Sequence, residues 1–416
     1  MSAGIAGNMI VSASSNIMTG KNSTFQELLM TNKNMHLFVE QLSYLRGAAL
    51  KLGQLLSLES GDFVPDPIAK IFAEVRNDAY SMPPRQLRKV LSEAWGDDFL
   101  TEFKSFDVMP LAAASIGQVH KCKTANNKTL AIKIQYPGVK ESIKSDIKNM
   151  GFLFKSSGLI PNNRLLKELL EEAKNQLYQE VDYLAEAKHL FKFSKLLEND
   201  LYFDVPTLER EFSTNKTLAM EFKSGITIDK LVNSDQTTKD IIIERLIELV
   251  FKEIFEFRLI QTDPNFANFL YDKKTKKIVL LDFGATKTLD VKTVTNFSIL
   301  VKAIFQQNRK EIESTLYELE LIPEDLPGHI LSSVLNVITK YGLLVNGGRL
   351  LDFSHPTLTR DVEALSGQFI EIRDSVQIPP FSTLLVQRKI GGIFMLARSF
   401  KARTDLKKII KKYIQD

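Results

Sequence analysis

Three oxygen-bearing side chains at fixed spacing constrain this chain more than any other feature. Asp263 is followed five positions later by Asn268, and Asp282-Phe283-Gly284 begins nineteen positions after Asp263. Two β-like runs between them, Phe269–Tyr271 and Lys277–Leu281, are joined by a polar turn and predict a hairpin that brings Asn268 and Asp282 together. Amide and carboxylate oxygens are the ligands that Mg²⁺ prefers when it neutralises clustered phosphates. We therefore expect Asn268 and Asp282 to bind Mg²⁺, with Asp263 as a base or orienting group for the nucleophile.

The same order of motifs is typical of protein kinases, which place an Asp-x4-Asn loop before Asp-Phe-Gly. Upstream, Lys133 in the run Ala131-Ile132-Lys133-Ile134 matches the strand lysine that contacts phosphates in those enzymes. Sixteen residues before it, Gly117 ends the run Ala112-Ala113-Ala114-Ser115-Ile116-Gly117, where kinases have glycines. Alanine methyl groups restrict the backbone, so we predict a stiffer phosphate loop in a different pose. Taken singly, each motif also fits a turn or a solvated strand edge, and only their combination favours a nucleotide site.

The expected secondary structure has the order of a bilobal, protein-kinase-like α+β fold. Residues 1–105 are mainly helical and predict an N-terminal helical extension that carries the motif Lys-x-Gly-Gln. Residues 106–222 predict a small strand-rich N-lobe, and residues 223–416 predict a helical C-lobe. The strands expected in the N-lobe are Gly117–Lys121, Thr129–Gln135 and Leu218–Phe222, and one long helix is expected over Leu165–Leu197.

The long helix of the N-lobe offers carboxylates that could orient Lys133. If this helix is continuous, Glu180 falls inside its apolar stripe, where a carboxylate is costly unless it is paired. Lys133 is the expected partner. Asp182 and Glu186 are expected on a different face, either as a solvated acidic edge or as partners of a group from elsewhere.

A helix expected over Phe38–Leu56 carries Gly47, Lys51 and Gln54 on the side opposite its apolar stripe. These residues fit an ordinary polar surface, but the missing side chain of Gly47 would also let that face approach another surface closely. In that second interpretation, Lys51 is expected to reach Asp182 or Glu186.

Four motifs in this order resemble the UbiB family of atypical kinase-like proteins. They are Lys51-Leu52-Gly53-Gln54, the Ala112–Ser115 run, Glu180-Val181-Asp182 and Gln261-Thr262-Asp263-Pro264-Asn265-Phe266-Ala267-Asn268. The likeness covers nearly the whole chain. The Gln-Thr-Asp-Pro-Asn loop is similar to that of the ubiquinone-biosynthesis branch, which includes mitochondrial members and bacterial relatives.

The resemblance implies ATP and Mg²⁺ as cofactors, with Lys133 as the nucleotide lysine and Glu180 as its partner. Asp263 would take the catalytic-loop role, and Asn268 and Asp282 would bind the metal. The other residues implied to contact the nucleotide are Ala112, Ala113, Ala114, Ser115 and Gly117, together with Glu221 and Phe222 of a hinge that offers its backbone to adenine. A regulatory set implied to lie over the site and block protein substrates comprises Lys51, Gln54, Asp182 and Glu186.

From this resemblance we expect an atypical kinase-like ATPase of the phosphotransferase class, whose acceptor the sequence does not name. It would support ubiquinone (coenzyme Q) biosynthesis by handling lipid precursors rather than by phosphorylating proteins, since no Ala-Pro-Glu sequence follows Gly284. The alternative is a non-catalytic nucleotide-binding scaffold of a biosynthetic complex. The expected partners are ATP or ADP, prenyl-quinone lipid precursors, a membrane surface and other ubiquinone-biosynthesis proteins.

Charge and composition narrow the possible partners and the possible cellular compartment. The chain has 54 basic and 50 acidic residues with both signs interspersed, so no nucleic-acid partner is expected. Its single cysteine, Cys122, excludes an intramolecular disulfide framework. We expect no membrane-spanning helix and find no transit pattern, which favours a bacterial cytoplasmic protein at the periphery of the inner membrane; a mitochondrial protein is the alternative. The basic residues from Lys401 to Lys412 predict an amphipathic helix that is either solvated or docked on an anionic membrane.

Overall fold

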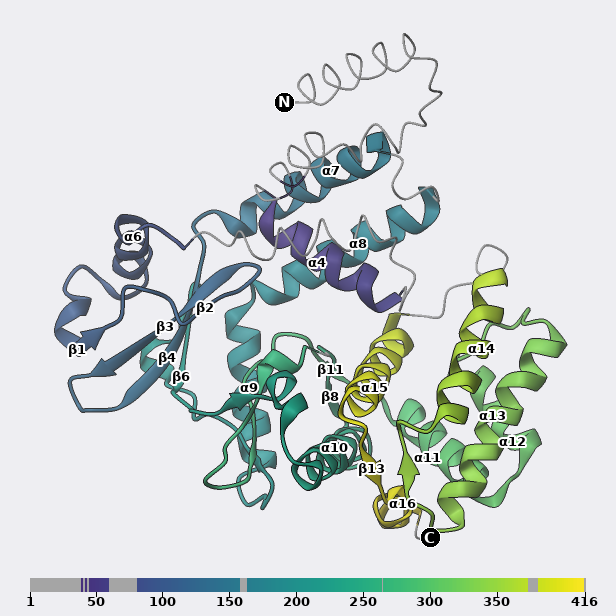
Figure 1. Ribbon diagram of the computed structural model, residues 1–416. Helices are drawn as coiled ribbons and strands as arrows, with labels where there is room; N and C mark the ends of the chain where they lie inside the picture. The colour runs from purple at the N-terminus through teal and green to yellow at the C-terminus, as the bar shows by residue number, and fades with distance from the viewer. Residues whose placement is uncertain are drawn as a thin grey trace, which may run out of the picture. The chain divides into compact units, whose positions relative to one another are not determined.

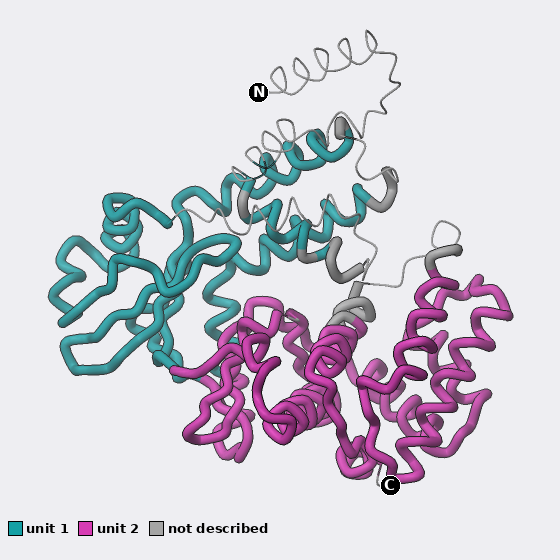
Figure 2. The backbone as a smooth tube through the Cα atoms, viewed as in Figure 1, with its two compact units in different colours: residues 1–191, 206–223 teal, residues 192–205, 224–416 magenta. Residues whose placement is uncertain are grey.

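The computed structural model describes residues 45–59, 81–157, 163–263, 265–372 and 381–414, together with Val39 and Leu42. It divides into two compact units (Figure 2). The first unit comprises Met1–Phe191 and Pro206–Lys223, and the second comprises Lys192–Val205 and Ser224–Asp416. The first carries a five-stranded sheet and the second is mostly helical, which is the α+β content expected from the sequence.

An antiparallel sheet with the strand order β1-β3-β4-β6 forms the centre of the first unit, and β2 pairs with β3 (Figure 1). The strands are β1 (Phe103–Phe106), β2 (Ala112–Ala113), β3 (Gly117–Thr124), β4 (Thr129–Gln135) and β6 (Thr217–Glu221). The three strands predicted for this region are confirmed, with shifts of a few residues at their ends. Lys133 lies in β4 between Val119 of β3 and Leu218 of β6, so the sheet holds its backbone on both sides.

The helices of the first unit pack around this sheet and around one another. They are α4 (Arg46–Glu59), α6 (Pro84–Trp95), α7 (Val139–Ser157), α8 (Asn163–Glu180) and most of α9 (Tyr183–Leu196), with the short 3-10 turns η2 (Phe99–Glu102) and η3 (Arg210–Phe212). Leu87 and Leu91 of α6 join Leu130 and Ile132 of β4 in one apolar cluster. The helix α4 packs against α7 and α8, and its predicted apolar face is buried at Ala49 and Leu52.

The prediction of one long helix over residues 165–197 is wrong in one respect. The structure has two helices there, α8 and α9, separated by a break. Val181 and Asp182 lie outside both helices. The carboxylate of Asp182 accepts a hydrogen bond of 2.9 Å from the backbone N–H of Ala185, which is the geometry of an N-cap. A new helix therefore begins at Tyr183 with its own rotational phase.

Short strands in the second unit hold together the segment around residues 259–288. The order β5-β10-β9-β7 forms one sheet, β8 pairs with β11, and β12 pairs with β13. The strands are β5 (Phe203–Asp204), β7 (Ile226–Thr227), β8 (Leu259–Gln261), β9 (Phe269–Tyr271), β10 (Ile278–Leu280), β11 (Thr286–Thr288), β12 (Leu351–Asp352) and β13 (Arg403–Thr404). The predicted hairpin is confirmed: β9 and β10 pair in antiparallel register with Ile278 opposite Tyr271.

Helices make up the rest of the second unit. They are α10 (Gln236–Phe251), α11 (Val291–Gln306), α12 (Arg309–Glu318), α13 (Gly328–Asn346), α14 (Pro356–Ile372), α15 (Phe381–Phe400) and α16 (Leu406–Ile414), with η4 (Ile228–Asn233), η6 (Phe266–Asn268) and the π-helical segment η5 (Lys252–Phe257). The helix predicted to follow the Asp-Phe-Gly sequence begins at Val291, where Asp290 caps it by accepting from the N–H of Thr293.

Two helices bear on the question of a membrane. Within the described ranges, α13 has the length and the mean hydropathy, 1.2, of a helix that could cross a bilayer. This is weak support for a span because helices in a folded core pass the same test, and α13 packs on α11, α12, α14 and α16. The predicted amphipathic helix at the C-terminus is present as α16. Its Lys412 contacts Glu248 at 2.5 Å and its Ile409 is buried, which favours packing on the protein itself.

Candidate active site

The strand lysine predicted from the sequence, Lys133, has a carboxylate partner within the first unit. The Nζ atom of Lys133 lies 2.5 Å from Oε1 of Glu186, and the two side chains are 15% and 3% exposed. A buried carboxylate beside a lysine fixes the ammonium group in position and preserves both charges. The structure therefore assigns the orienting role to Glu186, in the first turn of α9.

Glu180, which was predicted to pair with Lys133, makes different contacts. Its carboxylate contacts the ammonium group of Lys51 and accepts a hydrogen bond from the hydroxyl of Ser115. The prediction failed because it treated residues 165–197 as one continuous helix. The break at residues 181–182 resets the helical phase, so Glu186 rather than Glu180 turns toward β4.

The helix break is itself tied to the central sheet. Gln135, at the end of β4, donates a 2.7 Å hydrogen bond from its side-chain amide to the carbonyl of Val181. Asp182 is exposed, in agreement with the solvated acidic edge considered from the sequence, and its carboxylate caps α9. The signal that could have located Glu186 was the capping preference of Asp182, followed by the new apolar period Tyr183, Ala187 and Leu190.

Lys51 is buried, with 4% of the residue exposed, and it reaches Glu180 rather than the predicted Asp182 or Glu186. Gly47 allows this approach: a Cβ atom placed on it would lie 2.9 Å from the carbonyl oxygen of Ser115. The close contact expected of Gly47 is therefore present. The side chain of Gln54 lies outside the described residues.

The alanine-rich run forms a short hairpin with the strand that follows it. Ala112 and Ala113 pair with Val119 and Gln118, and the N–H of Ala114 donates to the carbonyl of Gly117 at 2.8 Å. A Cβ atom at Gly117 would lie 2.2 Å from the carbonyl oxygen of Ile134, so no other residue fits there without a shift of β4. These hydrogen bonds hold the loop close to the sheet, and the stiffness expected from its alanines stays a prediction.

The segment proposed as a hinge follows β6. The N–H of Phe222 donates to the carbonyl of Thr129 at 2.9 Å, so this donor belongs to the sheet and is not open to adenine. The carboxylate of Glu221 contacts Lys223 at 3.0 Å and accepts a hydrogen bond from the hydroxyl of Thr207. Any hinge contact with a nucleotide must therefore use other backbone groups than the Phe222 N–H.

In the second unit, the structure brings Asp263, Asn268 and Asp282 together. The side-chain N–H of Asn268 donates to Oδ2 of Asp263 at 2.9 Å. The N–H of Leu281 donates to the backbone carbonyl of Asn268 at 3.0 Å, which sets Asp282 next to Asn268 across the hairpin. The N–H of Gly284 donates to Oδ1 of Asp282 at 3.0 Å.

This arrangement fits Mg²⁺ by its donor set. Because the nitrogen of the Asn268 amide is engaged with Asp263, the oxygen is the atom presented away from that contact. One amide oxygen and one carboxylate suit Mg²⁺, which usually takes few protein ligands and completes its shell with water and phosphate oxygens. Among the described residues no cluster of three or more His, Cys, Asp or Glu side chains offers an all-protein metal site.

The loop is anchored on both flanks by the core of the second unit. Thr262 donates to the carbonyl of Ala285 from both its N–H, at 2.8 Å, and its hydroxyl, at 2.7 Å. Phe283 is fully buried, and its ring centre lies 4.8 Å from that of Phe193. The carboxylates of Asp263 and Asp282 are thus attached to rigid backbone.

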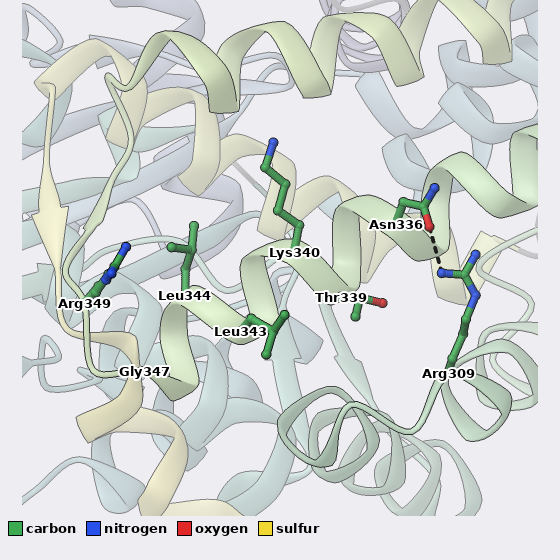
Figure 3. A pocket seen from close by; sticks show the side chains of 8 residues that line it. All are labelled: Arg309, Asn336, Thr339, Lys340, Leu343, Leu344, Gly347 and Arg349. Atoms are coloured by element: carbon green, nitrogen blue, oxygen red, sulfur yellow. Dashed lines mark hydrogen bonds between the residues drawn. The ribbon is translucent and has the colours of Figure 1, made fainter.

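A separate pocket of about 630 Å³ lies in the second unit (Figure 3). Its lining residues come from α12, α13 and the turn that follows α13: Arg309, Asn336, Thr339, Lys340, Leu343, Leu344, Gly347 and Arg349. Arg309 donates to the side-chain oxygen of Asn336 at 2.7 Å, as the dashed line marks. None of the residues predicted to act on a nucleotide lines this pocket.

Comparison with known proteins identifies the family. The family model described as the ABC1 atypical kinase-like domain matches residues 74–316. The chain belongs to the ABC1 atypical kinase-like family. It is similar to atypical kinase COQ8, mitochondrial, of Saccharomyces cerevisiae, with 34% identity over 99% of this chain and 82% of the yeast protein. Schizosaccharomyces pombe COQ8 is 35% identical over 92% of this chain and 63% of its own length. Danio rerio COQ8B is 34% identical over 90% of this chain and 60% of its own length.

A solved structure with low sequence identity supports the fold. The complex of Rv3197 with erythromycin from Mycobacterium tuberculosis aligns over 100% of both chains with a TM-score of 0.63 and 20% identity. At this identity the likeness shows the fold alone. The resemblance to the UbiB family and the bilobal kinase-like fold class, both expected from the sequence, are confirmed.

Proposed function

We propose that this ABC1-family protein binds Mg-ATP, hydrolyses it or transfers its terminal phosphate to a small acceptor, and so supports ubiquinone biosynthesis. The observation that carries the proposal is the Asp263–Asn268 hydrogen bond beside Asp282, since it presents one amide oxygen and one carboxylate at the end of a rigid hairpin. The relatives named above are called atypical kinases, which supports the phosphotransferase class.

Each residue has a distinct role in this proposal. Asn268 and Asp282 hold Mg²⁺, and the ion neutralises phosphate charge when it is bound. Lys133, fixed by Glu186, contributes a cation for nucleotide phosphates. Asp263 orients the nucleophile, which is water in an ATPase and a hydroxyl group in a kinase.

The chain between the Asp-Phe-Gly sequence and α11 argues against protein substrates. Residues 286–288 form β11, which pairs with β8, and Asp290 already caps α11. Protein kinases use a longer segment at this point to dock peptides. A small-molecule acceptor or water is therefore the better partner, and prenyl-quinone precursors at a membrane surface are the acceptor class that the family suggests.

The names of the relatives include the word mitochondrial, and on this ground we propose the mitochondrion, rather than a bacterial cytoplasm, as the compartment. The prediction made from the missing transit pattern favoured the opposite alternative. Fractionation of cells that express the full-length protein with a C-terminal tag measures this directly.

Nucleotide binding and turnover test the proposed function. A ligand at 100 times its Kd stabilises the folded state by about 2.7 kcal/mol, so Mg-ATP and Mg-ADP should raise Tm by several degrees. Phosphate release is measured in parallel, with and without lipid vesicles. Asp282→Asn should abolish Mg²⁺-dependent binding and turnover.

The matched control is Asp272→Asn at the other end of the same hairpin. Asp272 caps the β-turn by accepting from the N–H of Lys274 and the hydroxyl of Thr275, far along the strands from Asp282. Its replacement should leave nucleotide binding unchanged. Binding without phosphate release under every lipid condition would favour the alternative of a non-catalytic scaffold, and no binding at all would refute both.

A further inference from the structure

A fully buried ion pair lies next to the catalytic loop of the second unit. The ammonium group of Lys389, on α15, contacts Oε2 of Glu253. Glu253 is 0% exposed and Lys389 is 3% exposed. Burial raises the pKa of the Glu253 carboxyl and lowers the pKa of the Lys389 ammonium, while the charge of each partner acts in the opposite direction.

The location of Glu253 connects the pair to the loop through the backbone. Glu253 lies in the π-helical segment η5, which ends at Arg258 in a left-handed conformation with φ of 51° and leads directly into β8. π-helical turns insert an extra residue and are frequent at functional sites. The backbone N–H of Gln261, at the end of β8, is close enough to the carboxyl of Glu253 to lower its pKa. Gln261 is two residues from Asp263.

Lys389 is connected to the same loop through a small cavity. Its side chain lines this cavity together with Asp263, and the remaining wall consists of apolar side chains from α10, η6, β9 and α15: Leu246, Leu249, Phe266, Phe269 and Ile393. The pair is therefore connected to the catalytic loop at the end of β8 and at the cavity that Lys389 and Asp263 both line.

The energetics of such a pair favour a role other than stability. Removing two charges from water costs several kcal/mol, and well-packed apolar replacements of buried ion pairs are often as stable or more stable. Here the desolvation is also incompletely offset: in the described structure Oε1 of Glu253 and both polar atoms of the buried Gln261 side chain have no hydrogen-bond partner. Buried polar groups that lack hydrogen-bond partners are rare in proteins, and those that are retained often serve a functional role.

We propose that Lys389, fixed by Glu253, is a positioning residue that holds β8 and Asp263 in the orientation required for catalysis. This inference rests on the proposed function, because it assumes that Asp263 acts on the nucleophile. Neither residue of the pair touches substrate in this account. Both act through the backbone and the cavity wall.

The test uses a neutral double variant, Glu253→Gln with Lys389→Met, in the full chain. Each single change leaves one partner buried without its counter-charge and should lower Tm, and the double variant should recover most of the loss. If the pair positions the loop, kcat for phosphate release in the double variant should fall about tenfold while KM for ATP stays within about twofold. Hydrogen exchange of the amides in residues 259–268 should quicken about tenfold without nucleotide, while the β9–β10 amides stay protected.

The control is the neighbouring ion pair of Lys252 and Asp200, whose charged atoms lie 2.9 Å apart in the same unit. Lys252→Met with Asp200→Asn should leave kcat and the exchange of residues 259–268 unchanged.

A double variant of Glu253 and Lys389 with wild-type kcat and wild-type loop exchange would overturn the proposal. If the wild-type protein shows no turnover, the proposed function fails, and loop exchange alone then decides whether the pair positions the loop. If the double variant melts too early for the standard assay, kcat and loop exchange are measured at a temperature below its Tm, and wild-type values there overturn the proposal in the same way.

Discussion

Two glutamates six residues apart have different partners in the first unit. Glu186 contacts Lys133, whereas Glu180 contacts Lys51 and Ser115. Both are carboxylates on helices of this unit. What separates them is the helix break between α8 and α9, which periodicity alone does not reveal. For Asp263, Asn268 and Asp282, the sequence spacing was sufficient to predict that they lie close together, because one short hairpin fixes their relative positions.

Exchanging each carboxylate for an amide separates the two roles. Glu186→Gln removes the charge that orients Lys133, and we expect the Kd for Mg-ATP to rise about tenfold. Glu180→Gln leaves the pair of Lys133 and Glu186 intact, so its effect on the same Kd should be less than about threefold. Titration calorimetry measures both values. Equal losses in the two variants would contradict the assignment of Glu186.

At the scale of elements, the contact of α4 with the alanine-rich hairpin depends on one missing side chain. Gly47 lies on α4 directly against the backbone of Ser115, and a Cβ atom placed on it would also lie 3.5 Å from Cδ2 of Leu177 on α8. The sequence indicated this close approach from the position of Gly47 opposite the apolar stripe. It did not indicate the surface that α4 meets, because packing between elements far apart in the chain depends on the whole fold.

Gly47→Ala tests that contact. Its Cβ would lie 2.9 Å from a backbone carbonyl that has no flexible end to move, so we expect a loss of about 1–3 kcal/mol in the free energy of unfolding. Gly367→Ala is the matched control, because Gly367 also lies within a helix and a Cβ there meets nothing within 4 Å. That change should be neutral or stabilise by about 0.5–1 kcal/mol. Chemical denaturation of both variants measures the difference, and equal effects would refute the close contact.

At the scale of the whole molecule, the order of motifs predicted the kinase-like fold, while the contacts of the C-terminus were beyond prediction. The basic residues of α16 fitted both a membrane surface and a solvated face. In the structure, Lys412 contacts the buried carboxylate of Glu248 on α10, and Tyr413 donates a 2.7 Å hydrogen bond to Glu256. Nothing in the local pattern of lysines and isoleucines identifies acceptors more than 150 positions away.

The pair of Lys412 and Glu248 predicts a pH-dependent contribution to stability. Burial alone would raise the pKa of Glu248, but hydrogen bonds and charges from Lys412 and Arg245 outweigh it and lower the pKa. A carboxyl with a lowered pKa stabilises the fold above its unfolded value and loses that contribution as the pH falls through its folded value. Lys412 is half exposed, so Lys412→Ala should cost only about 0.5 kcal/mol at pH 7 and less at pH 3.

Thermal melts at pH 7 and pH 3 measure this difference between the variant and the wild type. Lys411→Ala is the control, since Lys411 is exposed on the same helix and has no ion-pair partner among the described residues. It should leave Tm unchanged at both pH values. A loss for Lys412→Ala that is the same at pH 3 as at pH 7 would contradict a contribution from charge.

Lys51, Glu180 and Ser115 also link three segments that are far apart in the sequence: the first described helix, the end of α8 and the alanine-rich hairpin. The hydroxyl of Ser115 in the hairpin donates to the Glu180 carboxylate, which Lys51 also contacts. Opening the hairpin therefore disturbs this set of contacts. Lifting the hairpin breaks the hydrogen bond from Ser115 to Glu180, and displacing α4 removes Lys51 from the same carboxylate. Because α4 and the hairpin share this carboxylate, we expect a ligand that displaces one segment to change the affinity of the other for its own ligand, and any such coupling is reciprocal.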